Sequence, residues 1–200
     1  KVSILTGATQ TLEKADLNAL VLTYHDGAKI EFNPSTFTIN SKTWTIGENG
    51  EVVLRSSTPA TGLLELTEAD QRVVIRTQPS KTGTGSDIKV EISRVNLADF
   101  APFFMPRNRL EGLLSGNILI EDPTTSLKIT SDDIQTRFLR LDNDSLGEVR
   151  ANLVYDDKLK ELKVKGNTLN PVNYLGFDAT LYFGDKEKMK NNLITLKAQQ

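Results

Sequence analysis

Hydrophobic and polar residues alternate along most of this chain, and the alternation is clearest in three segments that each open on a glycine. The segments are GLLSGNILIED at 112–122, GEVRANLVYDD at 147–157 and GFDATLYFGDK at 176–186. A period of two places successive side chains on opposite faces of an extended strand. The three segments therefore predict β-strands of one sheet with an apolar face and a solvated face.

Further strands are expected along the whole sequence, joined by short turns. They are predicted at 19–24, 28–32, 36–40, 43–46, 51–55, 63–67, 72–77, 87–93, 126–130, 134–141, 161–166 and 193–198. His25-Asp26-Gly27, Asn33-Pro34-Ser35 and Glu48-Asn49-Gly50 have turn-forming composition, and the Asn-Gly pair in the last is a hairpin signal. The pattern predicts successive hairpins in one antiparallel sheet.

Helical patterns are few. Residues 95–104 place Leu97, Phe100, Phe103 and Phe104 on one helical stripe after Asn96, which is a good N-cap, and Pro106 is expected to end the helix. Residues 9–20 also have some helical character, and 184–192 are expected to form a polar connector. Residues 78–87 bring two glycines, a proline and no apolar side chain to bury, which predicts an exposed loop.

These signals predict an all-β fold: an elongated, curved antiparallel sheet of repeated hairpins with one short helix. Two hundred residues suffice for a single elongated β domain over 1–200, in which the 78–87 loop is the best internal boundary.

Composition excludes several classes of partner and chemistry. The formal net charge is −2 with acids and bases interspersed, so nothing attracts a polyanion, and nucleic acid is not an expected partner. The chain has no cysteine, which excludes disulfides and thiolate chemistry. No run approaches the ~18 to 20 apolar residues that a membrane-spanning helix needs.

Catalytic and phosphate-binding motifs find little support. The single histidine, His25, sits in a presumed turn, where a solvated side chain is expected, and no G-x-S-x-G motif is present. The segment TGTGSD at 82–87 lacks the spacing of a phosphate-binding loop. We therefore expect no enzymatic activity and no cofactor.

Acidic pairs are the remaining candidates for ligand chemistry. They are Asp132-Asp133, Asp142 with Asp144, and Asp156-Asp157. Clustered carboxylates can bind calcium, but 141–147 lacks the glycine and later glutamate of an EF-hand loop, and turns favour aspartate for their own reasons. No metal site is predicted.

The apolar face itself is the candidate site. We predict that it is lined by Val149, Ala151, Leu153, Tyr155, Phe177, Ala179, Leu181 and Phe183. Such a face must be covered by a second layer, by its own curvature or by a ligand. A protein core is the alternative interpretation, but the shortage of helices and of a distinct second sheet favours an open apolar trough.

Residues 95–104, RLEGLLSGNILIED at 109–122 and LRLDNDSLGEVRANLVYDD at 139–157 resemble the TamB (translocation and assembly module) type of the AsmA-like family, in its Bacteroidetes form. The shared pattern is a short helix, a strand with glycines at Gly112 and Gly116, and a segment from Leu139 to Val149. The likeness is strongest over 94–185.

The resemblance implies a fold and a role. Members of this family are long proteins, anchored in the inner membrane, that cross the periplasm of Gram-negative bacteria toward an outer-membrane barrel partner. Their sheets form a U-shaped β-taco with an apolar interior, and the family is linked to phospholipid transport and outer-membrane assembly. On this basis the chain is expected to be an internal segment that binds phospholipid acyl chains.

Two other classes of function remain open. A structural or chaperone-like β-module would pair an exposed edge strand with strands of unfolded outer-membrane proteins. Exposed edges would also allow a homodimer of this segment. A glycan-binding domain would need exposed aromatic residues gathered on a wet face, and Trp44, Tyr24, Tyr174 and Tyr182 are too scattered in sequence to support one.

Overall fold

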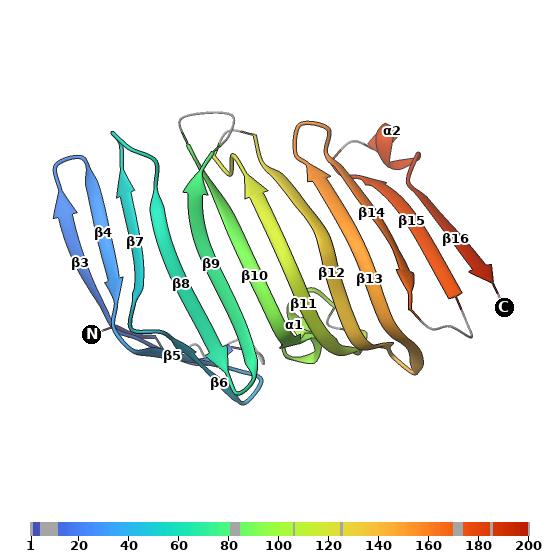
Figure 1. Ribbon diagram of the computed structural model, residues 1–200, viewed down its shortest axis with the longest axis horizontal. Helices are drawn as coiled ribbons and strands as arrows, with labels where there is room; N and C mark the ends of the chain where they lie inside the picture. The colour runs from blue at the N-terminus through green and yellow to red at the C-terminus, as the bar shows by residue number, and fades with distance from the viewer. Residues whose placement is uncertain are drawn as a thin grey trace.

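A computed structural model describes residues 2–4, 12–80, 85–105, 107–124, 126–169, 174–184 and 186–199, and every strand in these ranges joins one antiparallel sheet (Figure 1). The strands are β1 Val2–Ile4, β2 Leu12–Leu17, β3 Ala19–Tyr24, β4 Gly27–Phe32, β5 Ser35–Ile39, β6 Lys42–Ile46, β7 Gly50–Arg55, β8 Thr61–Glu68, β9 Gln71–Pro79, β10 Ser86–Asn96, β11 Leu110–Glu121, β12 Lys128–Leu141, β13 Asp144–Asp156, β14 Glu161–Thr168, β15 Tyr174–Tyr182 and β16 Leu193–Gln199. Two short helices, α1 Leu97–Phe104 and α2 Lys186–Met189, lie off the sheet. The predicted all-β curved sheet is confirmed.

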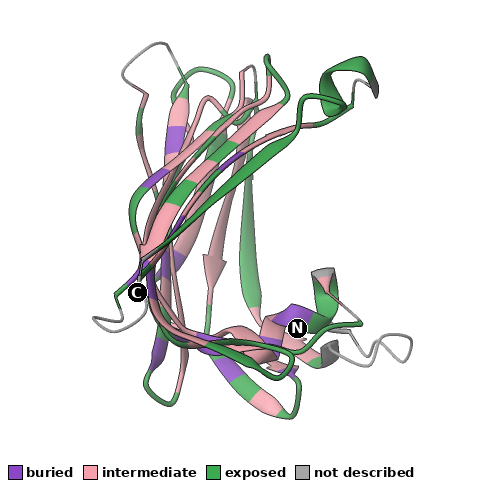
Figure 2. Cartoon of the chain, turned by 90° about the vertical axis from the view of Figure 1, so that its right-hand side faces the viewer, coloured by how far each residue is buried: buried purple, intermediate pink, exposed green. Residues whose placement is uncertain are grey.

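The first half of the sheet is a meander of long strands, each broken in the middle. The halves of the broken strands are β2 and β3, β4 and β5, and β6 and β7. In the lower part of the sheet β2 pairs with β5 and β5 pairs with β6, and in the upper part β3 pairs with β4 and β4 pairs with β7. β6 and β7 then both pair with β8, at its opposite ends. The sheet therefore folds along the line of the breaks, and β5 and β6 turn away from the upper strands (Figures 1 and 2).

This topology corrects two turn predictions. Asn33-Pro34 and Glu48-Asn49 do not close hairpins, because the strands that they join are continuations of one another and are not paired. They are bends at the fold of the sheet, where proline removes a backbone donor and glycine and asparagine tolerate irregular backbone. A hairpin turn that the sequence analysis missed lies at Asn40-Ser41, where both residues have positive φ.

β-Bulges bend the second half. Register shifts interrupt the pairing of β10 with β11, of β11 with β12 and of β12 with β13. Residues with positive φ lie in these strands at Arg94, Gly112, Gly116, Phe138 and Gly147. A Cβ on Gly116 would come within 2.9 Å of the Asp133 carbonyl oxygen, so the close approach of the strands requires glycine there. An extra residue on one strand bends it and increases its twist.

Seen along its long axis, the sheet is a curved layer with a concave and a convex face (Figure 2). The convex face is polar and carries ion pairs. Lys29 pairs with Glu31 of its own strand, and pairs between neighbouring strands join Lys29 to Glu51, Arg72 to Glu65 and Arg76 to Glu91. The concave face is apolar and is called the trough below. Its side chains include Ile30, Val52, Leu64, Ile75, Val90, Ile118, Leu153, Val164 and Ala179, most of which are directly paired across neighbouring strands.

A hydrophobic cluster forms where α1 covers the trough. Trp44 of β6 stacks on Phe37 with ring centroids 6.3 Å apart and meets Phe100 of α1 edge-on at 5.7 Å. Ile39 and Val95 are buried beside it. The side chain of Asn96 accepts a hydrogen bond from the Ala98 amide, which confirms the predicted N-cap.

An ion pair with a buried carboxylate fastens α1 to the folded-over part of the sheet. Lys42 Nζ at the start of β6 donates to Asp99 Oδ2 at 2.8 Å, and the Asp99 side chain is 2% exposed. Gln71 of β9 joins this cluster, since its amide oxygen accepts from the Asn96 backbone N–H at 2.6 Å. The pair closes the lower end of the trough around α1.

Several other predictions need correction. Residues 12–20 are strand, in β2 and β3, so the helical interpretation of 9–20 is wrong, and 9–11 lie outside the described residues. In α1 the inward positions belong to Phe100, Asp99 and Ala101, while Phe103 is exposed. Pro106 and the side chain of Phe104 are outside the described residues. The connector at 184–192 contains the short helix α2.

The 78–87 segment is shorter as a loop than predicted. β9 runs to Pro79 and β10 begins at Ser86, and these two residues are paired. Residues 81–84 lie outside the described part. The strands SLKIT and IQTRFLRL, expected separately at 126–130 and 134–141, form the single bulged strand β12.

Candidate functional site: an apolar trough

The predicted lining residues lie on one face of the sheet. Within β13, Val149, Ala151, Leu153 and Tyr155 alternate with more polar neighbours, and Leu153 pairs with Val164, which in turn pairs with Ala179 of β15. This is the concave face, because Val149 lies in the same cross-strand row as Thr136, Leu114 and Val95, and Val95 packs in the cluster under α1.

The same face continues from β13 into β15. Leu181 pairs with Leu162, and the Phe177 ring lies over the backbone of Gly166, where an added Cβ would come within 2.5 Å of the ring. Phe183 follows the end of β15 and reaches the Tyr155 ring, with centroids 6.4 Å apart. The structure therefore brings the eight predicted residues together, seven of them on β13 and β15 and Phe183 directly after β15.

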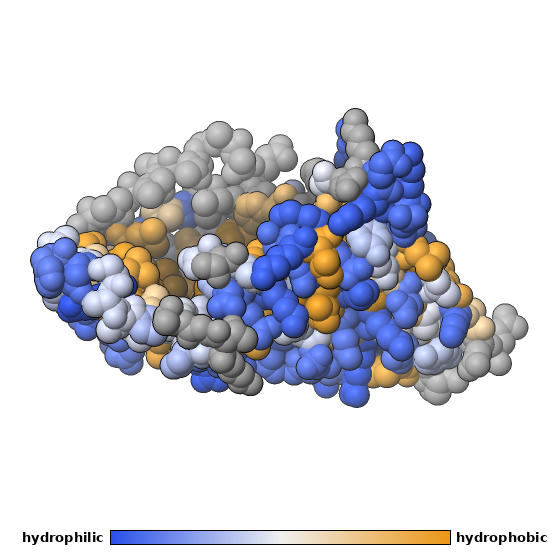
Figure 3. All heavy atoms as spheres, turned by 90° about the horizontal axis from the view of Figure 1, so that it is seen from above, coloured by the Kyte–Doolittle hydropathy of each residue, from blue (hydrophilic) through white to orange (hydrophobic). Residues whose placement is uncertain are grey.

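No second layer covers this region in the part of the chain that the structure describes. Among the residues with described positions, the elements off the sheet are α1, which packs on the cluster around Trp44, and the four-residue helix α2. Only Val149 and Ala179 are buried among the eight predicted residues; Phe183 is exposed and the other five are half-buried. Seen from above, hydrophobic side chains gather in the hollow of the molecule while the convex side is mostly hydrophilic (Figure 3).

A further apolar groove lies elsewhere on the same face, over β7 to β10. It has a volume of about 470 Å³ and is lined by apolar side chains that include Val52, Leu54, Leu64, Ile75 and Ile88. Pro59 and Ala60 of the β7–β8 connection and Pro123 after β11 form its upper wall. None of these residues was predicted as a site residue, although Val52, Leu54, Leu64, Ile75 and Ile88 lie in the strands predicted at 51–55, 63–67, 72–77 and 87–93.

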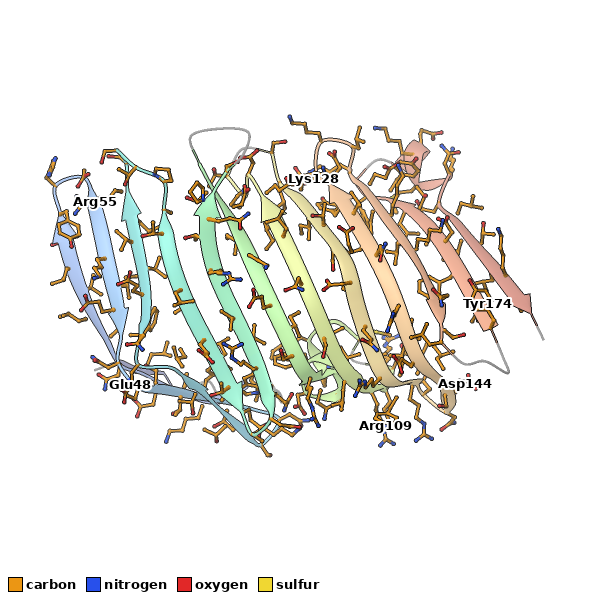
Figure 4. All side chains as sticks on the ribbon, in the orientation of Figure 1. Glu48, Arg55, Arg109, Lys128, Asp144 and Tyr174 are labelled. Carbon is orange, nitrogen blue, oxygen red and sulfur yellow. The ribbon has the colours of Figure 1, made fainter. Side chains whose placement is uncertain are left out.

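Polar groups are concentrated at the upper rim of the trough. Tyr155 Oη donates to Asp157 Oδ1 at 2.9 Å, which raises the pKa of the Tyr155 hydroxyl. Lys160 Nζ donates to the same carboxylate at 2.6 Å, and this contact lowers the pKa of Asp157. At the other end of the sheet, Arg55 pairs with Asp26 and lies 3.9 Å above the Tyr24 ring (Figure 4). The rim thus presents paired charges, while the trough floor between is apolar.

The other candidate side chains have structural partners. His25 is 94% exposed in the β3–β4 turn, as predicted. Asp142 accepts from the Arg109 backbone N–H at 2.8 Å, Asp133 accepts from Asn117, and Asp156 caps the turn that follows β13. Among the residues with described positions, no three acidic or histidine side chains come together as a metal-binding group.

Comparison of the chain with protein-family models, with curated proteins and with solved structures finds no match. The described helices include none that is long and apolar enough to cross a membrane. The trough is therefore interpreted from its own geometry. It offers a long, curved, apolar surface with an uncharged floor and a polar rim, which suits a ligand with an alkyl chain.

Proposed function

We propose that the trough binds the acyl chains of phospholipids, and that the chain is a segment of a TamB-type, AsmA-like lipid-conduit protein without enzymatic activity. In this proposal the parent protein is anchored in the inner membrane of a Gram-negative bacterium, crosses the periplasm, and meets an outer-membrane barrel partner. The observation that carries the proposal is the continuous apolar face from β4 to β15, which no second layer covers within the described residues.

Burial of alkyl groups supplies the driving force. Each CH₂ group removed from water contributes about 0.8 kcal/mol, so a chain lying along several strands gains affinity without a specific polar contact. Neighbouring strands lie about 4.8 Å apart, so successive rows of Leu, Ile and Val side chains present similar contacts along the whole sheet. A ligand that moves from one row to the next meets nearly the same surface, which suits transport along the trough.

Photocrosslinking tests this proposal with a matched pair of variants. Leu153 and Val154 are adjacent in β13 but point to the concave and convex faces respectively. A benzoylphenylalanine at Phe177 should crosslink to phospholipid when the chain is expressed within its parent protein in a Gram-negative host. Leu153→Asp and Leu181→Asp should abolish the crosslink, because each places a charge on the trough floor, whereas Val154→Asp should preserve it.

Circular dichroism of each variant should show that the sheet is retained. If the crosslink to phospholipid persists in both trough variants, or is lost equally in Val154→Asp, the trough does not bind the acyl chain.

One observation favours the alternative of edge-strand pairing. β16 pairs only with β15 among the described strands, and it exposes Leu193, Ile194 and Leu196 by 62–64%. An extended segment of an outer-membrane protein, or a second copy of this chain, could add to that edge. A photoreactive residue at Thr195 that crosslinks to an outer-membrane protein, or to a second copy of the chain, would support this function, whereas crosslinks to lipid alone would not.

A further inference from the structure

The convex face contains a hollow where the bulges of β10, β11 and β12 meet. It has a volume of about 310 Å³ and is lined by Arg94, Leu113, Ser115, Gln135, Arg137 and Phe138. Leu113 pairs with Arg137 and Ser115 pairs with Gln135, so these side chains share the face opposite the trough. Figure 4 views this face and labels Arg109, which precedes β11, and Asp144, the first residue of β13, near the lower ends of these strands.

Phe138 is unfavourable for the fold on two counts. Its side chain is 75% exposed, the largest exposure among the large hydrophobic residues of the described chain. Its φ is +55°, a left-handed conformation that costs energy for any residue with a Cβ. Gly112 and Gly147 occupy the positive-φ positions on the neighbouring strands β11 and β13, where glycine avoids that cost.

The hollow carries an excess of positive charge. Arg137 has no acidic partner in the described structure, and Arg150 of β13 lies opposite Gln135. Arg94 pairs with Asp70, but both side chains are about 60% exposed, so the pair is weak and easily exchanged. The carboxylate of Glu148, also on β13, accepts a hydrogen bond from Gln135. Among the described residues, Arg137 is therefore the guanidinium group of the hollow without a carboxylate partner, while Asp70 and Glu148 already have partners.

We propose that this hollow docks a peptide segment of a partner protein that carries a carboxylate beside an apolar side chain. Arg137 receives the carboxylate, because a guanidinium donates two parallel hydrogen bonds to it. Phe138 and Leu113 contact the apolar side chain, and aromatic residues and arginine are both enriched at protein–protein interfaces. The strain at Phe138 is retained for this contact. The inference does not depend on lipid binding in the trough.

Fluorescence anisotropy with a defined peptide tests the proposal on the full chain. The probe is a fluorescein-labelled hexapeptide of alternating leucine and aspartate, and its counterpart has asparagine in place of aspartate. The aspartate peptide should bind saturably and more tightly than the asparagine peptide. Arg137→Ala and Phe138→Gly should each weaken it about tenfold, which is the size of a typical hot-spot effect. Arg76→Ala, which removes a convex arginine paired with Glu91, should leave binding unchanged.

Thermal unfolding of Phe138→Gly separates binding from stability. Because glycine relieves the positive φ, the variant should unfold at a temperature no lower than the natural chain. A clear drop in Tm would show that Phe138 serves the fold and would overturn the proposal. The absence of saturable binding, or equal binding of both peptides, would also overturn it. The proposal would also be overturned if phosphatidylglycerol vesicles, and not the peptide, bound in an Arg137-dependent way. That result would show that the hollow binds a membrane surface.

Discussion

The ion pair between Lys42 and Asp99 offers the sharpest test of how the trough is held in shape. Lys42 begins β6, in the folded-over part of the sheet, and Asp99 lies in the first turn of α1. The N–O distance is 2.8 Å, and Gln71 Nε2 also lies near this carboxylate, at 3.4 Å from Asp99 Oδ2. Lys42→Met keeps most of the side-chain volume and removes the charge, so it leaves a carboxylate that is 2% exposed without its cation.

The magnitude follows from the burial of the two partners. Removing one member of a buried ion pair costs about 3 to 5 kcal/mol, because the remaining charge is desolvated and uncompensated. The Lys42 side chain is 34% exposed, so water already screens part of the interaction. We therefore expect Lys42→Met to destabilise the fold by about 2 kcal/mol. Asp99→Leu should cost about 1 kcal/mol, since the remaining ammonium group can turn toward water.

Urea unfolding measured by tryptophan fluorescence reports on this region directly. The chain has one tryptophan, Trp44, and its ring packs against Phe100 of the helix that carries Asp99. The double variant Lys42→Met/Asp99→Leu should be more stable than the sum of the single effects predicts, with a coupling energy of about 1 to 2 kcal/mol. If Lys42→Met unfolds at the same urea concentration as the natural chain, or if the single effects simply add, the pair does not hold α1 on the sheet.

Two further predictions concern packing and pH. Gly166→Ala should lower Tm, because the added Cβ would lie 2.3 Å from the Arg150 carbonyl oxygen and 2.5 Å from Phe177 Cζ. Gly85→Ala is the control and should leave Tm unchanged, because there is open space around Gly85. Equal Tm values for the two variants would contradict this geometry. The Arg109 backbone N–H donates to the Asp142 carboxylate and lowers its pKa below the ordinary value of 3.8. The contribution of Asp142 to stability is therefore present above about pH 4 and is lost as the pH falls through the lowered pKa. The Tm difference between the natural chain and Asp142→Asn should therefore disappear in acid, and a difference that persists below that range would show that the charge is not involved.

The alternation of apolar and polar residues predicted the strands well, because each strand has one apolar and one solvated face. Where helical propensity competed, as in the Leu-Glu-Lys-Ala run at 12–15, pairing decided the outcome: Ala15 lies opposite Phe37 of β5, a contact distant in sequence. The bends at Asn33-Pro34 and Glu48-Asn49 have the composition of turns, and only the pairing partners of β4 to β7 distinguish a bend from a hairpin.

The candidate site was predicted in part. The residues on β13 and β15 share the expected face because both strands are regular over that stretch. The groove over β7 to β10 was missed because its walls come from connections, at Pro59-Ala60 and Pro123, whose positions depend on the fold. Bulges add a further difficulty, since they change the phase of the alternation within a strand. In β12 the concave side chains are Ile129 and Ser131, then Ile134 and Thr136.

The bulges also have a consequence for how such a sheet changes in evolution. An ordinary substitution alters one side chain, but each bulge depends on one surplus residue that has no counterpart on the neighbouring strand. Loss of a single codon at Phe138 would remove the surplus residue of β12 between Thr136 and Leu139, and with it the bulge at that point, whatever the side chains on either side. The curvature of the sheet thus depends on the number of residues in each strand. Insertions and deletions are therefore the mutations that can widen or narrow the trough.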